Sequence, residues 1–370
     1  MWALTSHRAG ETSQILALAE GLGWPFHTKR IRHRPGVPFF LLGASRLGLD
    51  PARSDHLAPP WPDLIISAGA RNEPIARWIQ AQADKPVRLV HIGRTWAAAR
   101  HFDLVITTPQ YRLAPAPNIL QNVTTLHRIT PGRLEAAARE WAPRLEDLPR
   151  PYIAVVVGGN SGPYSFSCDE AGRLARRASE LARRRGGALL VSTSARTPRA
   201  AALALEQGLS VPYQMYHWDS EPATNPYYAY LALADELIVT GDSIAMLSEA
   251  CATGNPVYIA DLGAGRHGMR DGQPTEHGSG IRCLDRDWLR RSVYRLTMRV
   301  GPRRASRDIR LVHRLLIGSG RAAWLGEPFP SSPPPPLEDM PRALTRVRAL
   351  LDPGAHHGRA GSPSSRVRAS

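Results

Sequence analysis

One short segment of the chain combines side chains that could hold a nucleotide. Gly241, Asp242 and Ser243 follow an apolar run and open a helical pattern that continues through Glu249. Free backbone N–H groups at a helix start, with the positive end of the helix dipole, suit a diphosphate. Ser243 can add a hydroxyl donor, and Asp242 is a natural N-cap residue. Glu249 lies about two turns into the helix, where a carboxylate could accept both hydroxyls of a ribose. A capped helix with Glu249 on a solvated face fits the same spacing.

Two more loops carry residues that suit phosphate oxygens, and each follows an apolar run typical of a buried strand. Glycines let a ligand approach the backbone closely, and an arginine can bind phosphate oxygens bidentately. Each loop alone is equally consistent with an ordinary strand-to-helix connection. All three loops are expected at one edge of one parallel sheet, and together they predict a nucleotide-binding site. The additional residues are Gly158, Gly159 and Asn160 in one loop and Ser194, Arg196 and Thr197 in the other.

The loop at residues 6–11 holds an acid–base pair, His7 and Glu11. A sugar transfer with inversion needs one base near the attacking hydroxyl, and either side chain could serve. His217 is another candidate base, although a lone histidine in a loop is more often merely exposed to solvent. A Ser-His-Asp pattern and a GxxxxGK[ST] loop are missing, which disfavours a hydrolase of that type and a P-loop protein.

These residues need a scaffold that brings strand ends together, and the order of the apolar runs predicts one. Strands that alternate with helices form parallel sheets, and the loops at the strand C-termini build the working edge. Strands are expected at 2–5, 63–67, 88–92 and 104–107, and again at 152–157, 188–192, 213–216, 236–240 and 256–260. The sequence therefore predicts an α/β protein with two Rossmann-like domains in series, which is the GT-B arrangement.

Changes in composition divide the chain into four expected segments. An N-terminal Rossmann-like domain on the acceptor side covers 1–130, and a C-terminal Rossmann-like domain for the nucleotide sugar covers 131–284. Basic amphipathic helices follow at 285–330. The region 331–370 begins with a proline-rich run and ends in Gly, Ser and Arg. This composition predicts a disordered tail that is dispensable for folding, with room for a short helix near 344–351.

The charge of the chain favours some partners over others. The net charge is +15, but Lys29 and Lys85 are the only lysines. The arginines are dispersed over several helical patterns, without an RNA-binding aromatic motif or a zinc finger, which disfavours nucleic acid as a partner. An anionic membrane surface fits better, because each basic residue near such a surface gains about 1 kcal/mol. A basic helical pattern around 288–299 is the candidate contact.

Targeting and cysteine patterns predict the compartment. The N-terminus lacks a positive start followed by an apolar run, and no apolar run approaches the roughly 20 residues of a membrane span. The three cysteines, Cys168, Cys251 and Cys283, have no zinc-ligand spacing, so no metal site is expected. We expect a cytoplasmic protein, with peripheral attachment to the inner face of the membrane as an option.

Over roughly residues 1–282 the sequence resembles the family named for the plant "elongated mitochondria" fission factor, which has many bacterial members. The resemblance is carried by Gly10, Gln14, Phe102-Asp103-Leu104-Val105, Pro117-Asn118, Ser194, Arg196-Thr197-Pro198, Asn225-Pro226-Tyr227, Thr240, Asp242-Ser243, Met246, Ser248-Glu249-Ala250, Thr253-Gly254 and Pro256-Val257. Two departures lie in the first domain. Residue 11 is Glu where many relatives have His, and Gln110-Tyr111-Arg112 replaces a triplet similar to His-Asp-Arg.

This family is in turn similar to GT-B glycosyltransferases. The resemblance implies a donor nucleotide on the second domain, held by a helix start, by Met246 and by a glutamate like Glu249. The implied activity moves a sugar from a nucleotide-sugar donor to an envelope lipid or glycan. In GT-B enzymes, helix dipoles and side chains stabilise the diphosphate leaving group without an obligatory metal. No cofactor besides the nucleotide sugar is therefore expected.

The resemblance also supports a second function. The plant relative is associated with recruiting a dynamin-like protein to mitochondria, so the chain could be a non-catalytic GT-B scaffold that recruits a protein partner to a membrane. The phosphate-suited loops of the second domain favour the enzyme. The altered loops of the first domain, at Glu11 and Gln110-Tyr111-Arg112, favour the scaffold.

Overall fold

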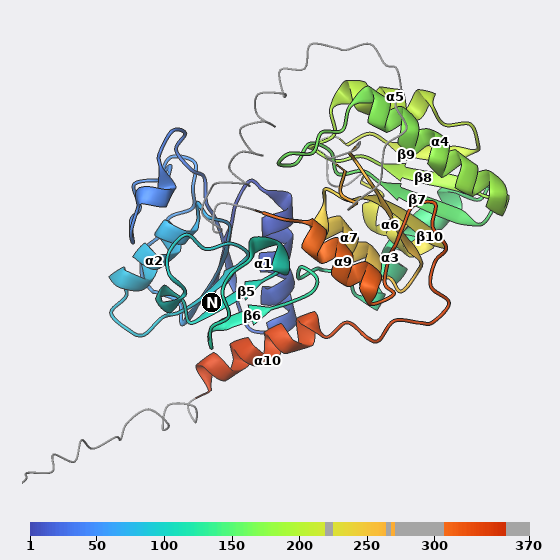
Figure 1. Ribbon diagram of the computed structural model, residues 1–370. Coiled ribbons are helices and arrows are strands. Elements are labelled where there is room, and N and C mark those ends of the chain that lie inside the picture. Colours follow the sequence, from blue (N-terminus) through green and yellow to red (C-terminus); the bar gives the residue numbers. More distant parts are fainter. Residues whose placement is uncertain (219–224, 264–267, 271–306, 353–370) are drawn as a thin grey trace, which may run out of the picture.

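The computed structural model describes residues 1–218, 225–263, 268–270 and 307–352, and these form two α/β halves that lie side by side (Figure 1). Each half is built on a six-stranded sheet in which all neighbouring strands are parallel. The predicted α/β class, with two Rossmann-like halves in series, is confirmed. In the described part of the chain, none of the helices has the length and apolar character needed to cross a bilayer.

The chain enters the first sheet at an interior strand and then adds strands on both sides of it. Its strands, in pairing order, are β2 (His27–Arg30), β1 (Trp2–Thr5), β3 (Leu64–Ala68), β4 (Arg88–Ile92), β5 (Leu104–Thr107) and β6 (Ile119–Gln121). The chain moves from β1 to β2 on one side and then crosses to β3 on the other. The switch point of this sheet therefore lies between β1 and β3, and ligands of open α/β sheets bind at such points.

Helices cover the first sheet because the sequence gives each an apolar face. Helix α1 (Ala9–Leu22) buries Ile15, Leu18 and Leu22, and it ends at Gly23, which adopts the left-handed conformation with φ of 71°. The other elements of this half are α2 (Glu73–Gln82) and the short 3-10 turns η1 (Phe39–Leu41), η2 (Ala99–His101) and η3 (Pro109–Tyr111).

The second sheet repeats the plan. Its strands, in pairing order, are β12 (Ala323–Trp324), β11 (Val257–Ala260), β10 (Glu236–Thr240), β7 (Tyr152–Val156), β8 (Ala188–Ser192) and β9 (Tyr213–Tyr216). Its helical elements are α3 (Pro131–Trp141), η4 (Ala142–Arg144), α4 (Cys168–Arg185), α5 (Arg199–Gln207), α6 (Tyr227–Leu233), α7 (Ile244–Cys251) and α9 (Arg310–Gly318). Strands β7, β8 and β10 are buried along their whole length, as expected of a parallel sheet covered on both faces. The switch point lies between β7 and β10.

The chain returns to the first half at its C-terminal end, where α10 (Asp339–Leu351) packs beside α1 (Figure 1). Ala343 and Val347 are fully buried in the first core. The Asp339 carboxylate accepts hydrogen bonds from the backbone N–H groups of Val123 and Thr124, at 3.1 and 2.7 Å. The short helix expected near 344–351 is confirmed and begins earlier, at Asp339. The disorder expected from 331 is corrected over this helix, because its apolar face finds cover on α1. The basic segment around 288–299 and residues 353–370 lie outside the described residues.

Candidate nucleotide site

The structure brings the three predicted phosphate loops together at the switch point of the second sheet. These loops follow β7, β8 and β10, which are neighbours in the sheet. The Gly158 N–H donates to Thr240 Oγ1 at 2.8 Å, and the Asn160 N–H donates to the carbonyl of Arg196 at 3.0 Å. The hydroxyl of Ser194 donates to the carbonyl of Gly158. Because parallel strands end at one edge, residues distant in the sequence form a single hydrogen-bonded network.

Asp242 is the centre of this network. Its fully buried carboxylate accepts hydrogen bonds from Thr240 Oγ1 at 2.7 Å, from Arg196 Nη1 at 2.6 Å and from the Gly159 N–H. Burial raises the pKa of Asp242, and the Arg196 charge opposes that shift. The expectation that Asp242 caps the following helix is wrong, because Ser243 is the N-cap of α7 and Asp242 turns back to Arg196.

The glycines of the first loop have a structural reason that involves no ligand. A Cβ added to Gly158 would lie 2.5 Å from Asp242 Oδ2. A Cβ added to Gly159, where φ is 123°, would lie 2.2 Å from the carbonyl oxygen of Arg196. The two glycines are required because other strand-end loops of the same sheet pack against them. Close approach of a ligand, the reason inferred from the sequence, is not needed to explain them.

The remaining loop residues are mostly engaged as well. Asn160 Oδ1 accepts from the Phe166 N–H at 2.8 Å, and Thr197 Oγ1 donates to the Gly158 carbonyl at 3.1 Å. Arg196 is the exception, because its side chain is 39% exposed while one edge of the guanidinium is held by Asp242. An arginine held in this way presents its remaining N–H groups in a defined direction.

The start of α7 lies against the first half of the molecule. Ser243 makes no side-chain capping hydrogen bond. A Cβ added to Gly10, in the first turn of α1, would lie 3.9 Å from the Cβ of Ala245. Met246 is half-buried against the second core. The helix start predicted to bind a diphosphate therefore adjoins the loop that holds the candidate catalytic residues.

Glu249 lies at the contact between the halves and not on a solvated face. Its carboxylate accepts hydrogen bonds from the Tyr227 hydroxyl at 2.5 Å and from Ser13 of α1. Burial raises the pKa of Glu249 to about 7, against the opposing effects of these hydrogen bonds and of the Arg128 charge. Near neutral pH the protonated and the ionised forms of this carboxyl group are therefore both populated.

The candidate bases His7 and Glu11 remain close to each other at the switch point of the first sheet. Glu11 accepts from Ser6 Oγ at 3.2 Å and from Arg8 Nη1 at 3.1 Å. His7 is largely exposed, but partial desolvation of its ring and the charge of Arg8 lower its pKa. Its imidazole is therefore neutral near pH 7 and able to accept a proton.

His217 and the Gln110-Tyr111-Arg112 triplet have different surroundings. His217 pairs with Glu206 at 2.8 Å on the exposed side of β9, the edge strand. In the triplet, Arg112 Nη2 contacts Asp308 Oδ2 at 2.6 Å, and the Gln110 carbonyl accepts from the Asp308 N–H at 2.8 Å. The triplet thus ties the first half to the segment that leads into α9.

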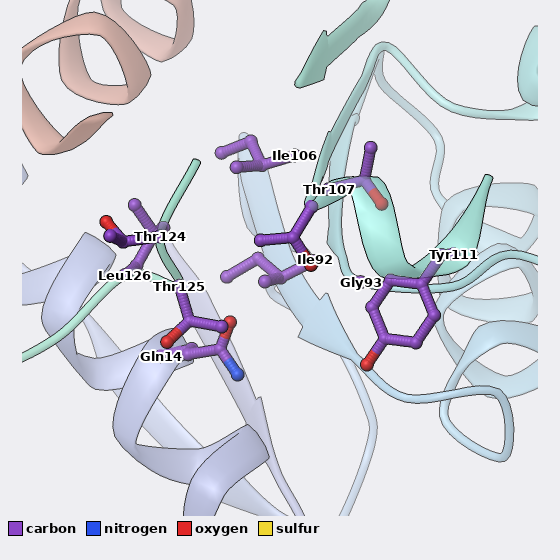
Figure 2. A pocket seen from close by; sticks show the side chains of 10 residues that line it. Gln14, Ile92, Gly93, Ile106, Thr107, Tyr111, Thr124, Thr125 and Leu126 are labelled. Carbon is purple, nitrogen blue, oxygen red and sulfur yellow. The ribbon is translucent and has the colours of Figure 1, made fainter. Parts of the chain in front are cut away.

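A small pocket opens between the first sheet and α1 (Figure 2). Figure 2 shows Ile92 and Ile106 between Tyr111 on one side and Gln14 and Thr125 on the other. The buried hydroxyl groups of Thr107 and Thr125 have no hydrogen-bond partner in the described part of the protein. Neutral hydroxyl and amide groups above an apolar floor suit a hydroxyl group of a ligand better than a charged group.

Sequence reasoning missed the residues that join the two halves around this site. The Thr125 N–H donates to Ser248 Oγ at 2.9 Å, and Tyr227 and Ser13 share the carboxylate of Glu249. Tyr227 and Ser248 belong to the motif that carries the family resemblance, and that was the available signal. Nothing in the sequence around Asp308 indicated its pairing with Arg112.

Comparison with known proteins places these observations in a family. The model of the family described as "Mitochondrial fission ELM1" matches residues 9–275. The mitochondrial fission protein ELM1 of Arabidopsis thaliana is 27% identical over 220 residues, which cover 54% of this chain and 51% of the plant protein. An uncharacterized protein of Rickettsia prowazekii is 26% identical over 294 residues, covering 70% of this chain and 82% of that protein.

Solved structures with similar topology are distant in sequence. A glycosyltransferase of Rickettsia africae superposes with a TM-score of 0.42 at 10% identity, over 94% of this chain and 97% of that one. The MnaA–UDP structure from S. aureus gives a TM-score of 0.45 at 9% identity, over 95% and 96% of the two chains. The family match covers well over half of the sequence and includes the loops of the candidate site. The chain therefore belongs to the mitochondrial fission ELM1 family.

Proposed function

We propose that the chain transfers a sugar from a nucleotide-sugar donor, bound at the start of α7, to a hydroxyl group of an envelope lipid or glycan. One observation carries the proposal. Three strand-end loops with phosphate-suited residues meet at the switch point of the second sheet, and the adjoining helix start lies against loop 6–11 of the first sheet. A donor at one edge and an acceptor at the other would then meet between the halves.

The donor would be held by groups with complementary charge. The N-terminal backbone of α7 and the exposed part of Arg196 suit the diphosphate, with Ser243 as a further donor. Glu249 would accept the ribose hydroxyls in its ionised form. Since its pKa is about 7, nucleotide affinity should increase as the pH rises through neutrality. In this scheme helix dipole and arginine stabilise the leaving diphosphate, and a metal ion is not an obligatory partner.

The transfer step requires a single base to take up the proton of the acceptor hydroxyl group. The acceptor oxygen forms a bond to the anomeric carbon while the bond from that carbon to the diphosphate oxygen breaks. The acceptor proton passes to the base, and the nucleoside diphosphate leaves with the bonding electrons. His7 suits the role of base because its lowered pKa keeps the imidazole neutral. Glu11, held by Ser6 and Arg8 beside it, is the other candidate.

Calorimetry with UDP, GDP, ADP and CMP tests the donor site. We expect one of these nucleotides to bind, and Glu249→Ala to weaken that binding at least about tenfold. Two charge-assisted hydrogen bonds are lost, each worth roughly 1.5–3 kcal/mol, and about 1.4 kcal/mol already gives a factor of ten. Ser243→Ala should act in the same direction but less strongly, because the backbone N–H groups remain.

Glu236→Ala is the matched control. Glu236 is as buried as Glu249 and pairs with Arg185 at 2.6 Å, but it begins β10 at the opposite edge of the sheet. The control should lose stability without losing affinity for the nucleotide. Equal affinity of wild type and Glu249→Ala would remove Glu249 from the site. Failure of the wild type to bind any nucleotide would contradict the donor site itself.

The alternative is a non-catalytic scaffold that recruits a protein partner to a membrane, and one observation favours it. The Asp242 carboxylate fills the space beside Gly158 and neutralises Arg196, which removes positive charge from the place where an enzyme would bind diphosphate. Absence of nucleotide binding in the calorimetric panel would decide for this scaffold.

A further inference from the structure

The loop at residues 34–48, which follows β2, presents large apolar side chains to solvent. Phe40, Leu41 and Leu47 are 54%, 74% and 63% exposed. Most of the other large apolar side chains in the described chain are at least partly covered. A cluster of exposed large apolar residues in one loop marks an interaction site more often than scattered single residues do.

This loop is held in place and does not collapse onto the sheet. The Arg34 N–H donates to the Gly48 carbonyl at 3.0 Å, which closes the base of the loop. The Ser45 N–H donates to the carbonyl of Pro74 on α2 at 3.0 Å. The ring of Phe39 packs against Trp96 at 6.0 Å between centroids. The apolar tip is therefore displayed by a supported backbone.

The charged side chains of the loop itself are all positive. Residues 32–49 contain three arginines and no Asp or Glu. Arg34 and Arg46 are exposed, and exposed Arg71 stands over the Phe39 ring. The nearest carboxylates are engaged: Asp50 accepts from the Ala52 N–H at 3.2 Å, and Asp55 pairs with Arg30. Glu73 of α2 accepts from the Trp96 and Ala97 N–H groups at 2.7 and 2.8 Å.

A small pocket lies beneath the tip, between loop 34–48 and α2. Arg34 and Arg71 line it together with apolar residues that include Phe39 and Ile75. Two guanidinium groups at the rim of an apolar pocket suit a phosphate group attached to hydrocarbon. The same chemistry, an anion next to an apolar phase, is what an anionic lipid bilayer offers.

We propose that loop 34–48 docks on an anionic lipid bilayer, with Phe40, Leu41 and Leu47 inserted at the interface and Arg34, Arg46 and Arg71 on the headgroup phosphates. The loop leaves the same sheet edge as loop 6–11, and His33 at its base contacts His7 ring to ring at 6.4 Å. Docking would thus place the bilayer beside the edge of the first sheet at which β1 and β2 end and loop 6–11 lies. The docking surface does not depend on sugar transfer, because a membrane scaffold would use it equally.

Co-sedimentation of the full chain with vesicles tests this surface. The wild type should bind vesicles of phosphatidylcholine mixed with phosphatidylglycerol and should bind phosphatidylcholine alone much more weakly. The double variant Phe40→Ser, Leu41→Ser should bind the mixed vesicles at least about tenfold more weakly, since two large apolar side chains leave the interface. Arg34→Gln with Arg46→Gln should weaken binding about fivefold per charge, and salt should weaken the wild type in the same way.

Matched controls separate the loop from general effects. Leu203 and Leu315 are exposed leucines of the second half, and their double replacement by Ser should leave vesicle binding unchanged. The same holds for Arg139→Gln with Arg199→Gln, which removes equal charge elsewhere. Vesicle binding by Phe40→Ser, Leu41→Ser equal to that of the wild type would overturn the proposal. So would equal binding to neutral vesicles, or a wild-type dimer that this variant dissociates, which would identify a second copy as the occupant. Nucleotide calorimetry on the same variants, expected to be unchanged, keeps this test distinct from that of the donor site.

Discussion

At the switch point of each sheet a carboxylate packs against a glycine, but the two carboxylates differ in how freely they can move. In the first sheet the carboxylate belongs to the first turn of α1, the helix after β1, and in the second sheet it follows the end of β10. Each carboxylate rests against a glycine that follows the neighbouring strand. Glu11 lies against Gly69 in the first sheet, and Asp242 lies against Gly158 in the second. Asp242 is fully buried with three hydrogen-bond donors, whereas the Glu11 side chain is 23% exposed and held by Ser6 and by the exposed Arg8.

This difference assigns separate roles to the two edges. At the second sheet the buried carboxylate, the arginine and the glycines satisfy one another, so a ligand can gain only from the groups left over, the start of α7 and the free side of Arg196. At the first sheet the carboxylate can move without breaking a buried ion pair. An edge of that kind suits a residue that must reach an acceptor.

Replacing each of these glycines by alanine is the most sensitive test of the comparison. In Gly158→Ala, the new Cβ displaces a carboxylate that is locked by Thr240 and Arg196. We expect a loss of about 3–5 kcal/mol in the free energy of unfolding, from overpacking together with broken charge-assisted hydrogen bonds. In Gly69→Ala, Glu11 can swing toward solvent, and the loss should be about 1–2 kcal/mol, mainly from the φ of 78°. Urea unfolding measures both, and equal losses would contradict the comparison.

The pH dependence of stability should report Glu249 at the contact between the halves. Its pKa is about 7 in the folded protein and near 4.5 when exposed, so the folded state holds the extra proton between these values. The free energy of unfolding should therefore fall as the pH rises from about 4.5 to about 7, by up to about 3 kcal/mol.

Glu249→Gln isolates this contribution, because the amide keeps the shape of the side chain and does not titrate. We expect the free energy of unfolding of the wild type to fall between about pH 5 and about pH 8. That of the variant should lack this contribution, so the two pH profiles should differ in slope. A wild type and a variant with parallel pH profiles would mean that Glu249 is solvated, as one interpretation of the sequence held.

Sequence patterns predicted the sheets well, because a buried parallel strand reads as an apolar run ended by polar or glycine residues. The strands that hold the second network were all located in this way, and their shared edge followed from the parallel order. The partners of Asp242 and Glu249 could not be found by such reasoning. A capping role for Asp242 is the local expectation, and only the approach of Arg196 from another strand end overrides it.

The C-terminal helix illustrates a different limit. Its proline-rich approach suggested disorder, while the apolar spacing of Ala343 and Val347 acquires meaning only when α1 provides cover. The same applies to Gln110-Tyr111-Arg112, whose partner Asp308 lies almost two hundred residues away in the sequence. Contacts between segments so distant leave no periodic pattern in either one.

The smallest expected effect concerns the pocket of the first sheet, where three threonines can be compared. Thr107 and Thr125 have buried hydroxyl groups without a partner in the described chain, so Thr107→Val and Thr125→Val should change stability by no more than about 0.5 kcal/mol or should stabilise. Thr124 lies beside them, but its hydroxyl donates to Asp339 at 2.6 Å, and Thr124→Val should cost about 1.5–3 kcal/mol. Urea unfolding of the three variants measures the contrast.

If the free hydroxyl groups serve an acceptor, Thr107→Val and Thr125→Val should still raise the KM for the acceptor, because only the bound ligand would use them. A loss of stability in Thr125→Val as large as that in Thr124→Val would show that its hydroxyl is already satisfied, and the open first edge would then be as closed as the second.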